Sequence, residues 1–426
     1  MLDIRTIREN PDAVRANLAR RRAPEKLALL EDVIASDAEW RRRLQELQEL
    51  RHRRNAVSLE IGRLVKEGKD AAEAKREAAQ LPDHIHSLEA RVDDLRAKTD
   101  EGLLRIPNVL HESVPDGAGP EDNVEVRRWR EPAVPDFPLT PHGDLVEALG
   151  LGDFERARKA AGAGFVYLLG DLVLLDQALL WFALKLLVQR GFTPVFPPFM
   201  LRRGAYQGVI DLKDFESVMY KVEGEDAYLI ATSEHPLVAM HKDEILDEGG
   251  LPIRLAGIAT QFRKEIGAHG VDTKGLFRMH QFNKVEQVLF ARPEDSWTLH
   301  EELLANLEAM FQALEIPYHV IVLCSADTGP VMAKTYDLEA WFPRQNAYRE
   351  CGSCSNALDY QARRLNIRVG KAGGEKRFVH TLNSTTVATS RALVAILENC
   401  QNQDGTVTVP KVLRDFVGKD VIGKAA

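Results

Sequence analysis

Two neighbouring stretches of the sequence combine charged and aromatic side chains that could recognise phosphate and a heterocyclic base. They are Phe262–Glu265 and Phe277–Glu286. The second stretch reads as a strand. Because successive strand side chains face opposite ways, Arg278, Phe282 and Glu286 would project from one side. Arginine pairs with phosphate through a planar fork, and an aromatic ring can stack on a base. The pattern therefore predicts a site for ATP beside a small polar substrate.

A hairpin would bring the first stretch against the second. Arg263 and Glu265 would share one face of their own strand, and the connection 266–275 is rich in glycine and polar residues, as hairpin loops are. The simpler interpretation is a solvated hairpin whose charges form cross-strand ion pairs. Phe282 on the same face favours the binding interpretation.

Composition limits the class of protein. The chain of 426 residues has room for two or three domains, and its 45% hydrophobic and 28% charged residues are ordinary for a soluble enzyme. A net charge of −8 argues against a general nucleic-acid coat protein but allows a local basic surface. We expect no membrane span and no signal peptide, and four cysteines favour a reducing, cytoplasmic location.

Two common kinds of site are not supported by the sequence. Cys351 and Cys354 form a lone Cys-x-x-Cys pair, whereas a structural zinc ion needs four ligands. A Walker loop is absent from the sequence, so the chain is not expected to be a P-loop ATPase.

The first 105 residues have the composition of long helices, with few glycines and many Ala, Leu, Arg and Glu. A first stripe with 4-3 spacing comprises Trp40, Leu44, Leu47, Arg51, Arg54, Ser58, Ile61 and Val65. A second comprises Leu81, Ile85, Leu88, Val92 and Leu95. A polar break at 66–70 separates them, which predicts a projecting antiparallel coiled-coil hairpin at about 37–103. Pro82 would start a new helical segment or kink the returning helix.

The outgoing helix of this predicted hairpin is basic between residues 41 and 54. The arginines there are Arg41, Arg42, Arg43, Arg51, Arg53 and Arg54. A basic helix face is usually just solvated. On a protruding hairpin, however, it could also grip the phosphates of a nucleic acid.

The pattern changes again after the helices. Residues 106–141 are rich in Pro, Gly and Asp and predict a linker with short extended pieces. From about residue 165 helical and strand patterns alternate. An apolar helix is predicted at Leu172–Arg190, followed by a strand at Phe192–Phe196.

The two stretches described first resemble motif 2 of the class II aminoacyl-tRNA synthetases, in the form found in seryl-tRNA synthetases. Other similar segments lie, in family order, at Arg54–Asn55, Leu104–Asn108, His111–Pro115, Gly191–Pro198, Thr232–Glu234, Tyr336–Glu339, Glu350–Asn356 and Thr381–Thr385 with Arg391. One such motif would be weak evidence for the family, but this many motifs in the right order form a specific signature. The resemblance spans nearly the whole chain.

The resemblance implies an α+β architecture. A tRNA-binding helical arm would occupy 1–105, the linker 106–141, and a class II catalytic domain 142–426, built on an antiparallel β-sheet flanked by helices. Gly191–Pro198 matches the end of motif 1, which forms the dimer interface in the family, so a homodimer is expected. The class I signatures His-Ile-Gly-His and Lys-Met-Ser-Lys-Ser are absent from the sequence.

The resemblance also implies an ATP site with Arg263 and Arg391 as catalytic residues. Arg263 would bridge the α-phosphate and the amino-acid carboxylate, and Arg278 would reach the γ-phosphate. Phe282 and Arg391 would sandwich the adenine. Glu265 would accept a hydrogen bond from the adenine amino group.

A magnesium site and a serine site complete the set. Glu350 and Ser353 would contact ATP through Mg²⁺ as hard oxygen ligands. Arg263 would hold the serine carboxylate, and the other serine-binding residues would be Thr232 and Glu234 near its ammonium group and Glu286 and Thr385 at its hydroxyl. A site that bonds a hydroxyl can reject alanine by roughly 10⁴. Thr385 could alternatively be a simple turn residue.

The leading hypothesis is an enzyme that makes seryl-adenylate from L-serine and ATP and transfers serine to the 3′ end of tRNA-Ser. An alternative is a paralogue that activates an amino acid for a non-tRNA acceptor such as a carrier protein, and the long basic arm argues against it. A non-enzymatic RNA-binding or scaffold protein is a third. The presence of Arg263, Glu286 and Arg391 argues against that reading.

Overall fold

The computed structural model describes residues 1–133, 135–265, 275–371 and 374–423, apart from the side chains of 213 and 214. Contacts divide the chain into two compact units, Met1–Pro107 and Asn108–Ala426. No helix within the described residues combines the length and the apolar character needed to cross a membrane.

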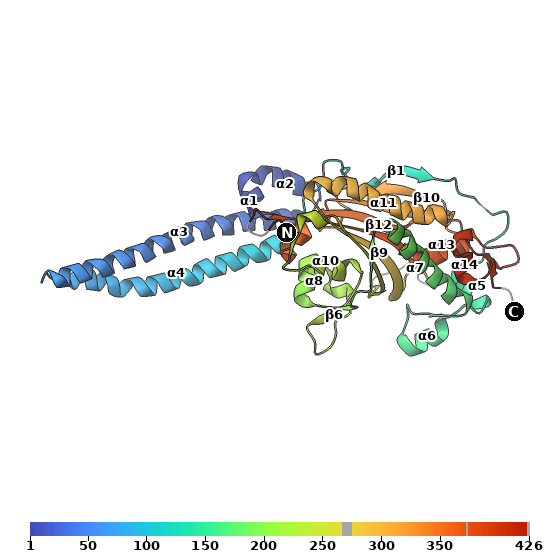
Figure 1. The fold of residues 1–426 in the computed structure, drawn as a ribbon, viewed down its shortest axis with the longest axis horizontal. Coiled ribbons are helices and arrows are strands. Elements are labelled where there is room, and N and C mark those ends of the chain that lie inside the picture. The colour runs from blue at the N-terminus through green and yellow to red at the C-terminus, as the bar shows by residue number, and fades with distance from the viewer. Residues whose placement is uncertain (134, 266–274, 372–373, 424–426) are drawn as a thin grey trace. The chain divides into compact units, whose positions relative to one another are not determined.

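The first unit is helical. Its helices are α1 (Ile4–Glu9), α2 (Pro11–Ala19), α3 (Pro24–Lys66) and α4 (Ala72–Arg105). The two long helices run side by side in opposite directions (Figure 1) and are joined at 67–71, where Gly68 takes a positive φ of 69°. Proline at the first helical position suits the start of α3. Pro82 lies inside α4, which continues through it.

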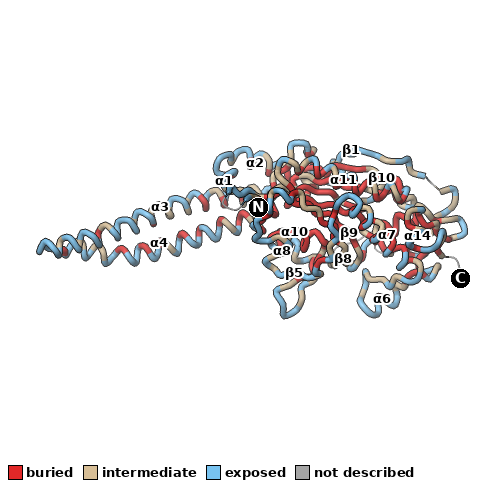
Figure 2. The backbone as a smooth tube through the Cα atoms, in the orientation of Figure 1, coloured by how far each residue is buried: buried red, intermediate tan, exposed pale blue. Residues whose placement is uncertain are grey.

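The buried seam between α3 and α4 differs in part from the predicted stripe. All five α4 positions are buried, as the alternating buried stretches of Figure 2 show, and the central α3 contact is made by Leu47 and Val57. Arg51, Arg54, Ser58 and Val65 are exposed instead, so that part of the prediction is wrong. Leu50 packs against the seam in place of Arg51 because an apolar side chain is preferred there over a charged one.

The second unit is built on an eight-stranded sheet. In spatial order its strands are β1 (Val124–Trp129), β10 (Tyr318–Val322), β11 (Lys334–Phe342), β12 (Ala347–Leu358), β15 (His380–Ala388), β9 (Gln281–Ala291), β8 (Ile253–Phe262) and β4 (Thr193–Val195). All neighbouring pairs are antiparallel except β4 with β8. The predicted α+β class is therefore confirmed. Residues 106–141 contribute β1 to this sheet, so that segment is more than a connection.

Helices cover the sheet (Figure 1). The α-helices described in this unit are α5 (His142–Ala148), α6 (Phe154–Ala161), α7 (Asp171–Gln189), α8 (Arg203–Val209), α9 (Leu212–Phe215), α10 (Glu234–Ala239), α11 (Ser296–Ala313), α12 (Tyr360–Leu365), α13 (Thr389–Asn399) and α14 (Arg414–Val417). The short strands are β2 (Gly152–Asp153), β3 (Tyr167–Leu168), β5 (Met200–Arg202), β6 (Ala227–Leu229), β7 (Ile245–Leu246), β13 (Arg368–Val369), β14 (Arg377–Phe378), β16 (Val407–Thr408) and β17 (Val421–Ile422).

Two apolar cores support the sheet. In the larger core, α7, α11 and α13 pack against it through leucines such as Leu179, Leu303 and Leu393. In the smaller core, α8, α10 and α12 pack against β8 and β9, with Tyr206 and Leu237 fully buried. Together these layers fix the central strands, which carry most of the polar side chains described below.

The predicted hairpin pairs as β8 with β9, but both strands are shorter at this end than the sequence suggested. The last paired residues are Phe262 and Gln281. Beyond them the backbone N–H of Arg263 donates to His280 O at 2.9 Å, and that of Lys264 donates to Val218 O at 2.8 Å. Because Lys264 bonds to another segment, strand pairing stops there.

The strand prediction is therefore wrong for three of the site residues. Arg263 and Glu265 follow β8, and Arg278 precedes β9. The loop prediction for 266–275 falls almost entirely on residues 266–274, which lie outside the described part of the chain.

Candidate active site

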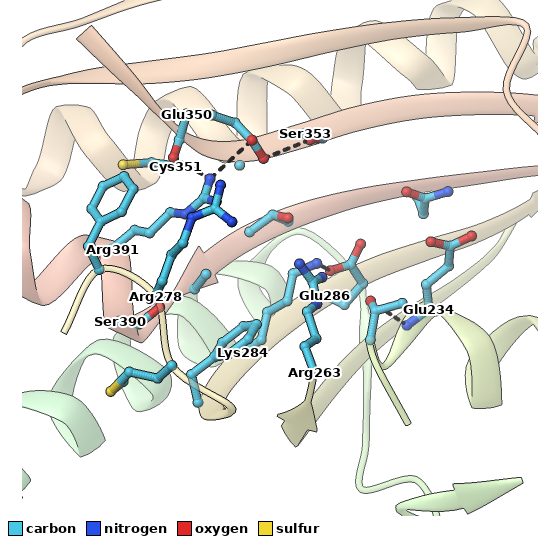
Figure 3. Close-up of a pocket in the computed structure, with 18 of the residues that line it drawn as sticks. Glu234, Arg263, Arg278, Lys284, Glu286, Glu350, Cys351, Ser353, Ser390 and Arg391 are labelled. Atoms are coloured by element: carbon cyan, nitrogen blue, oxygen red, sulfur yellow. Dashed lines mark hydrogen bonds and ion pairs between the residues drawn. The ribbon is translucent and has the colours of Figure 1, made fainter. Parts of the chain in front are cut away.

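One polar pocket collects side chains from the centre of the large sheet and from segments beside it. Most of the predicted site residues line it: Thr232, Glu234, Arg263, Glu265, Arg278, Phe282, Glu286, Glu350, Ser353, Thr385 and Arg391. Glu350, Ser353, Arg278 and Arg391 gather at one end of it, and Glu234 lies at the other (Figure 3).

Strand β9 presents Phe282, Lys284 and Glu286 to the pocket, because alternate residues of a strand share a face. Glu286 is buried, and the Lys284 ammonium group forms an ion pair with its carboxylate. Burial raises the pKa of Glu286, and Lys284 opposes that shift. The pair places one positive and one negative group in the floor of the pocket.

Glu234 is the first residue of α10 and is buried. Burial, followed by the charge of Glu286, raises its pKa to about 7. Its backbone N–H donates to Thr232 Oγ1 at 3.3 Å, which ties the two predicted ammonium-site residues together. Gln361 Nε2 donates to Glu234 Oε1 at 2.8 Å.

Thr385 lies on β15 directly opposite Glu286 on β9. It is buried, so the interpretation of Thr385 as a turn residue is wrong. Gly352 on β12 faces it closely, since a Cβ built on Gly352 would lie 3.0 Å from Thr385 Cβ. The Thr385 side chain is therefore held between neighbouring strands beside Glu286.

Arg263 lies between the two ends of the pocket (Figure 3). Its Nε donates to Ala231 O at 3.0 Å, and its guanidinium carbon lies 5.3 Å from the centroid of the Phe282 ring. Burial, followed by the charge of Arg391, lowers the pKa of Arg263. A cation held under those conditions is a strong point of attraction for an anion.

Arg391 contacts Glu350 rather than Phe282. Its Nη1 donates to Glu350 O at 2.6 Å and lies 3.1 Å from Glu350 Oε2, while its guanidinium carbon is 5.2 Å from the centroid of Phe277. Phe282 and Arg391 line the same pocket, and the predicted adenine sandwich would place the base between them.

Arg278 and Glu265 form an ion pair at the mouth of the pocket, with 3.3 Å between Nη1 and Oε2. The Arg278 side chain is 46% exposed, so it can reach an incoming ligand without losing much burial. Glu265 is thus paired with an arginine in this structure.

The predicted magnesium ligands lie on β12 within hydrogen-bonding distance, with Ser353 Oγ donating to Glu350 Oε1 at 3.3 Å. Asp337 lies opposite Ser353 in the sheet, and its buried Oδ1 has no hydrogen-bond partner among the described residues. The residues that the structure describes contain no group of three or more His, Cys, Asp or Glu side chains suited to holding a metal ion. Two oxygen ligands fit Mg²⁺, which usually takes the rest of its shell from phosphate and water.

Comparison with known proteins gives the family. Residues 1–110 match the seryl-tRNA synthetase N-terminal domain, and residues 219–400 match the class II tRNA synthetase core domain (G, H, P, S and T). The serine–tRNA ligase of Methanocella arvoryzae is 55% identical over 419 residues, covering 98% of this chain and 99% of the relative. The chain belongs to the seryl-tRNA synthetase family.

Solved structures agree with this membership. The seryl-tRNA synthetase of Pyrococcus horikoshii complexed with ATP matches with a TM-score of 0.96 and 47% identity, covering all of both chains. The cytoplasmic serine–tRNA ligase of Naegleria fowleri in complex with AMP matches with a TM-score of 0.91 and 36% identity, covering 99% of this chain and 98% of the other.

Five of the six predicted tRNA-binding arginines of the seryl-tRNA synthetase N-terminal domain already have acidic partners. Arg41 pairs with Asp37, and Arg42 and Arg43 pair with Glu39. Across the helix pair, Arg51 contacts Glu89 and Arg53 contacts Glu77. The Arg54 side chain is exposed. The structure thus spreads these groups along α3 rather than bringing them to one point.

Among the residues that the sequence did not assign to this family site, two contact its buried carboxylates. Lys284 lies two residues from both Phe282 and Glu286, so strand alternation alone could have assigned it to the pocket. Gln361 gave no such signal, because it reaches Glu234 from 127 residues away along the chain.

Proposed function

We propose that this chain activates L-serine with ATP and transfers serine to the 3′ end of tRNA-Ser. The observation that carries this is the division of one pocket into a guanidinium-rich end and a carboxylate end. Arg278 and Arg391 suit phosphates, and Glu234 and Glu286 suit an ammonium and a hydroxyl group. Arg263 lies between the ends. The full-length relatives named serine–tRNA ligase support the same assignment.

In the first step a serine carboxylate oxygen attacks the α-phosphorus of ATP. The new P–O bond forms as the bond from that phosphorus to the pyrophosphate oxygen breaks, giving seryl-adenylate and pyrophosphate. No protein nucleophile is needed, so positioning and charge neutralisation do the work. Arg263 would contact both the carboxylate and the α-phosphate and so hold two anions close together.

The remaining ATP contacts follow from the same pocket. Arg278 would bind the γ-phosphate after leaving Glu265, which then becomes available to the adenine amino group. Phe282 would stack on the adenine, with Arg391 over its other face. Glu350 and Ser353 would hold Mg²⁺, which when bound neutralises phosphate charge.

Serine would be selected at the carboxylate end. Glu234 and Thr232 would receive the ammonium group, and Glu286 and Thr385 would bond the hydroxyl. Alanine would leave these buried polar groups unpaired, which costs binding energy. The close approach of Gly352 to Thr385 limits the space for an additional methyl group.

In the second step a terminal ribose hydroxyl of tRNA attacks the carbonyl carbon of seryl-adenylate, and AMP leaves. We assign Arg41, Arg42, Arg43, Arg51, Arg53 and Arg54 to the grip on the tRNA backbone. The ion pairs that Arg51 and Arg53 form are partly exposed and weak, so phosphates can replace the carboxylates there. On this proposal 1–105 form the tRNA-binding arm and 142–426 the catalytic domain.

We also infer a cytoplasmic homodimer. Helix α7 exposes large apolar side chains on its outer side, including Val173, Leu174, Trp181 and Val188, and Phe196 after β4 is 74% exposed. A second copy covering this surface would remove it from water. Light scattering of the intact chain tests this, and a monomer at micromolar concentration would contradict it.

The deciding experiment is charging of unfractionated tRNA with labelled serine, ATP and magnesium. The proposal expects label in acid-precipitable tRNA that maps to serine acceptors. Serine-dependent exchange of pyrophosphate into ATP without label in tRNA would instead indicate a non-tRNA acceptor. Absence of both reactions would overturn the proposed function.

A further inference from the structure

We propose that Gln361 and Thr381 are positioning residues for serine, acting together to hold the Glu234 carboxylate as the acceptor for the substrate ammonium group. This inference rests on the proposed function, because it assigns a role within the serine end of the same pocket. Neither residue lines the pocket, and both are fully buried behind it.

Three side chains from separate elements form a chain of hydrogen bonds. Thr381 Oγ1 on β15 donates to Gln361 Oε1 on α12 at 2.6 Å. Gln361 Nε2 then donates to Glu234 Oε1 on α10 at 2.8 Å. This order of donors fixes the orientation of the Gln361 amide. Because its oxygen accepts from the threonine hydroxyl, its NH₂ group must face the Glu234 carboxylate.

The bond from Gln361 matters because the surroundings of Glu234 otherwise disfavour its charge. Burial and the neighbouring Glu286 both raise the pKa of Glu234. Gln361 lowers it, as do Lys284 on β9 and Arg263 after β8. A protonated Glu234 could not form an ion pair with an ammonium group, so Gln361 helps to keep the acceptor ionised.

The next residue on α10, His235, does not compensate for the loss of Gln361. Burial lowers the pKa of His235 to about 3, so its ring is neutral near pH 7. Lys284 is already committed to Glu286, and Arg263 is directed toward Ala231 and Phe282. Gln361 is therefore the neutral donor that holds Glu234 in place.

A simple packing role for Gln361 is the competing explanation, since its Nε2 also donates to Val209 O at 3.4 Å. Packing loss would weaken folding and every substrate alike. A positioning role would affect serine and leave ATP nearly untouched. The two explanations therefore differ in which Michaelis constant moves.

The test compares full-length variants by ATP–pyrophosphate exchange over a range of pH. Gln361→Met and Thr381→Val keep volume and remove the bonds, while Thr381→Ser keeps the hydroxyl. We expect Gln361→Met to raise KM for serine at least about tenfold, as for loss of a bond to a charged group. KM for ATP should stay within about twofold. Thr381→Val should show a smaller shift in the same direction, and Thr381→Ser should restore it.

The pH profile gives a second readout. Losing the Gln361 bond raises the pKa of Glu234, so the acidic limb of kcat/KM for serine should move to higher pH in Gln361→Met. Equal rises in both Michaelis constants, or an unchanged acidic limb, would overturn the inference. If Gln361→Met does not fold, the Thr381→Val and Thr381→Ser pair decides. Wild-type enzyme without serine-dependent exchange would overturn the proposed function itself.

Discussion

Arginine has opposite electrostatic surroundings in the helical unit and in the pocket: exposed and paired in the first, buried beside another arginine in the second. Along α3, the side chains of Arg42 and Arg53 are 66% and 55% exposed, and each has a carboxylate partner. In the pocket, burial and a second arginine, Arg391, lower the pKa of Arg263. An exposed pair is worth little, because water and salt replace it easily. A poorly solvated cation gains far more from an arriving anion, so the chemistry is expected in the pocket and exchangeable contacts on α3.

The carboxylates show the same contrast. Arg53 lowers the pKa of the partly exposed Glu77, whereas burial raises those of Glu234 and Glu286. Glu77 stays ionised with or without a ligand nearby. The two pocket carboxylates gain most when a positive or hydrogen-bonding group arrives.

Arg263→Ala should reduce adenylate formation by about 10³-fold, because it removes a positioned cation from the reacting phosphate. Arg42→Ala is the matched control, being the same substitution at an exposed, paired site, and should leave adenylate formation unchanged. Pyrophosphate exchange measures both. Exchange by Arg263→Ala within about tenfold of wild type would contradict the assigned role.

Replacing residues 41–95 with a short turn should lower charging of tRNA by about 10²-fold while sparing adenylate formation, because it removes the phosphate-binding arginines. The cut suits the structure, since the Arg96 guanidinium carbon lies 5.2 Å from the ring centroid of Trp40, a contact that pairs the two helices at those ends. Aminoacylation and pyrophosphate exchange should be measured in parallel. Unchanged charging would remove these arginines from the mechanism.

Thr385→Val should reduce the preference for serine over alanine by about tenfold, because it deletes one hydroxyl-bonding group and little volume. Thr386→Val is the control on the same strand, where the buried Thr386 hydroxyl has no hydrogen-bond partner among the described residues. Its selectivity should match wild type. The ratio of kcat/KM values for the two amino acids, from pyrophosphate exchange, measures the effect. An unchanged ratio in Thr385→Val would exclude it from hydroxyl recognition.

Arg53→Gln and Glu77→Gln, singly and together, should leave the melting temperature nearly unchanged, because the pair is exposed to solvent. Arg53→Gln alone should weaken tRNA binding and flatten its salt dependence. Calorimetry and a salt titration of tRNA affinity separate the two effects. A large drop in melting temperature would mean that the pair is structural.

Local patterns predicted the elements well where one periodicity dominated. The helix predicted at 172–190 is α7 (Asp171–Gln189), and all five predicted contact positions of α4 are buried. Local patterns gave the wrong element where the backbone forms hydrogen bonds with a segment other than the expected partner strand. Arg263, Glu265 and Arg278 were expected on strands, but the bond from Lys264 to Val218 ends the pairing early.

The fold class, the helical first unit and the family could be predicted from the sequence alone, because periodicity and ordered motifs are local properties of the chain. The sequence also named most residues of the pocket. Only the tertiary structure decided that Arg391 contacts Glu350 and Phe277, that Thr385 lies beside Glu286, and that Gln361 supports Glu234. Such contacts join residues far apart along the chain, and the burial that shifts their pKa values exists only once the sheet and its helices have packed.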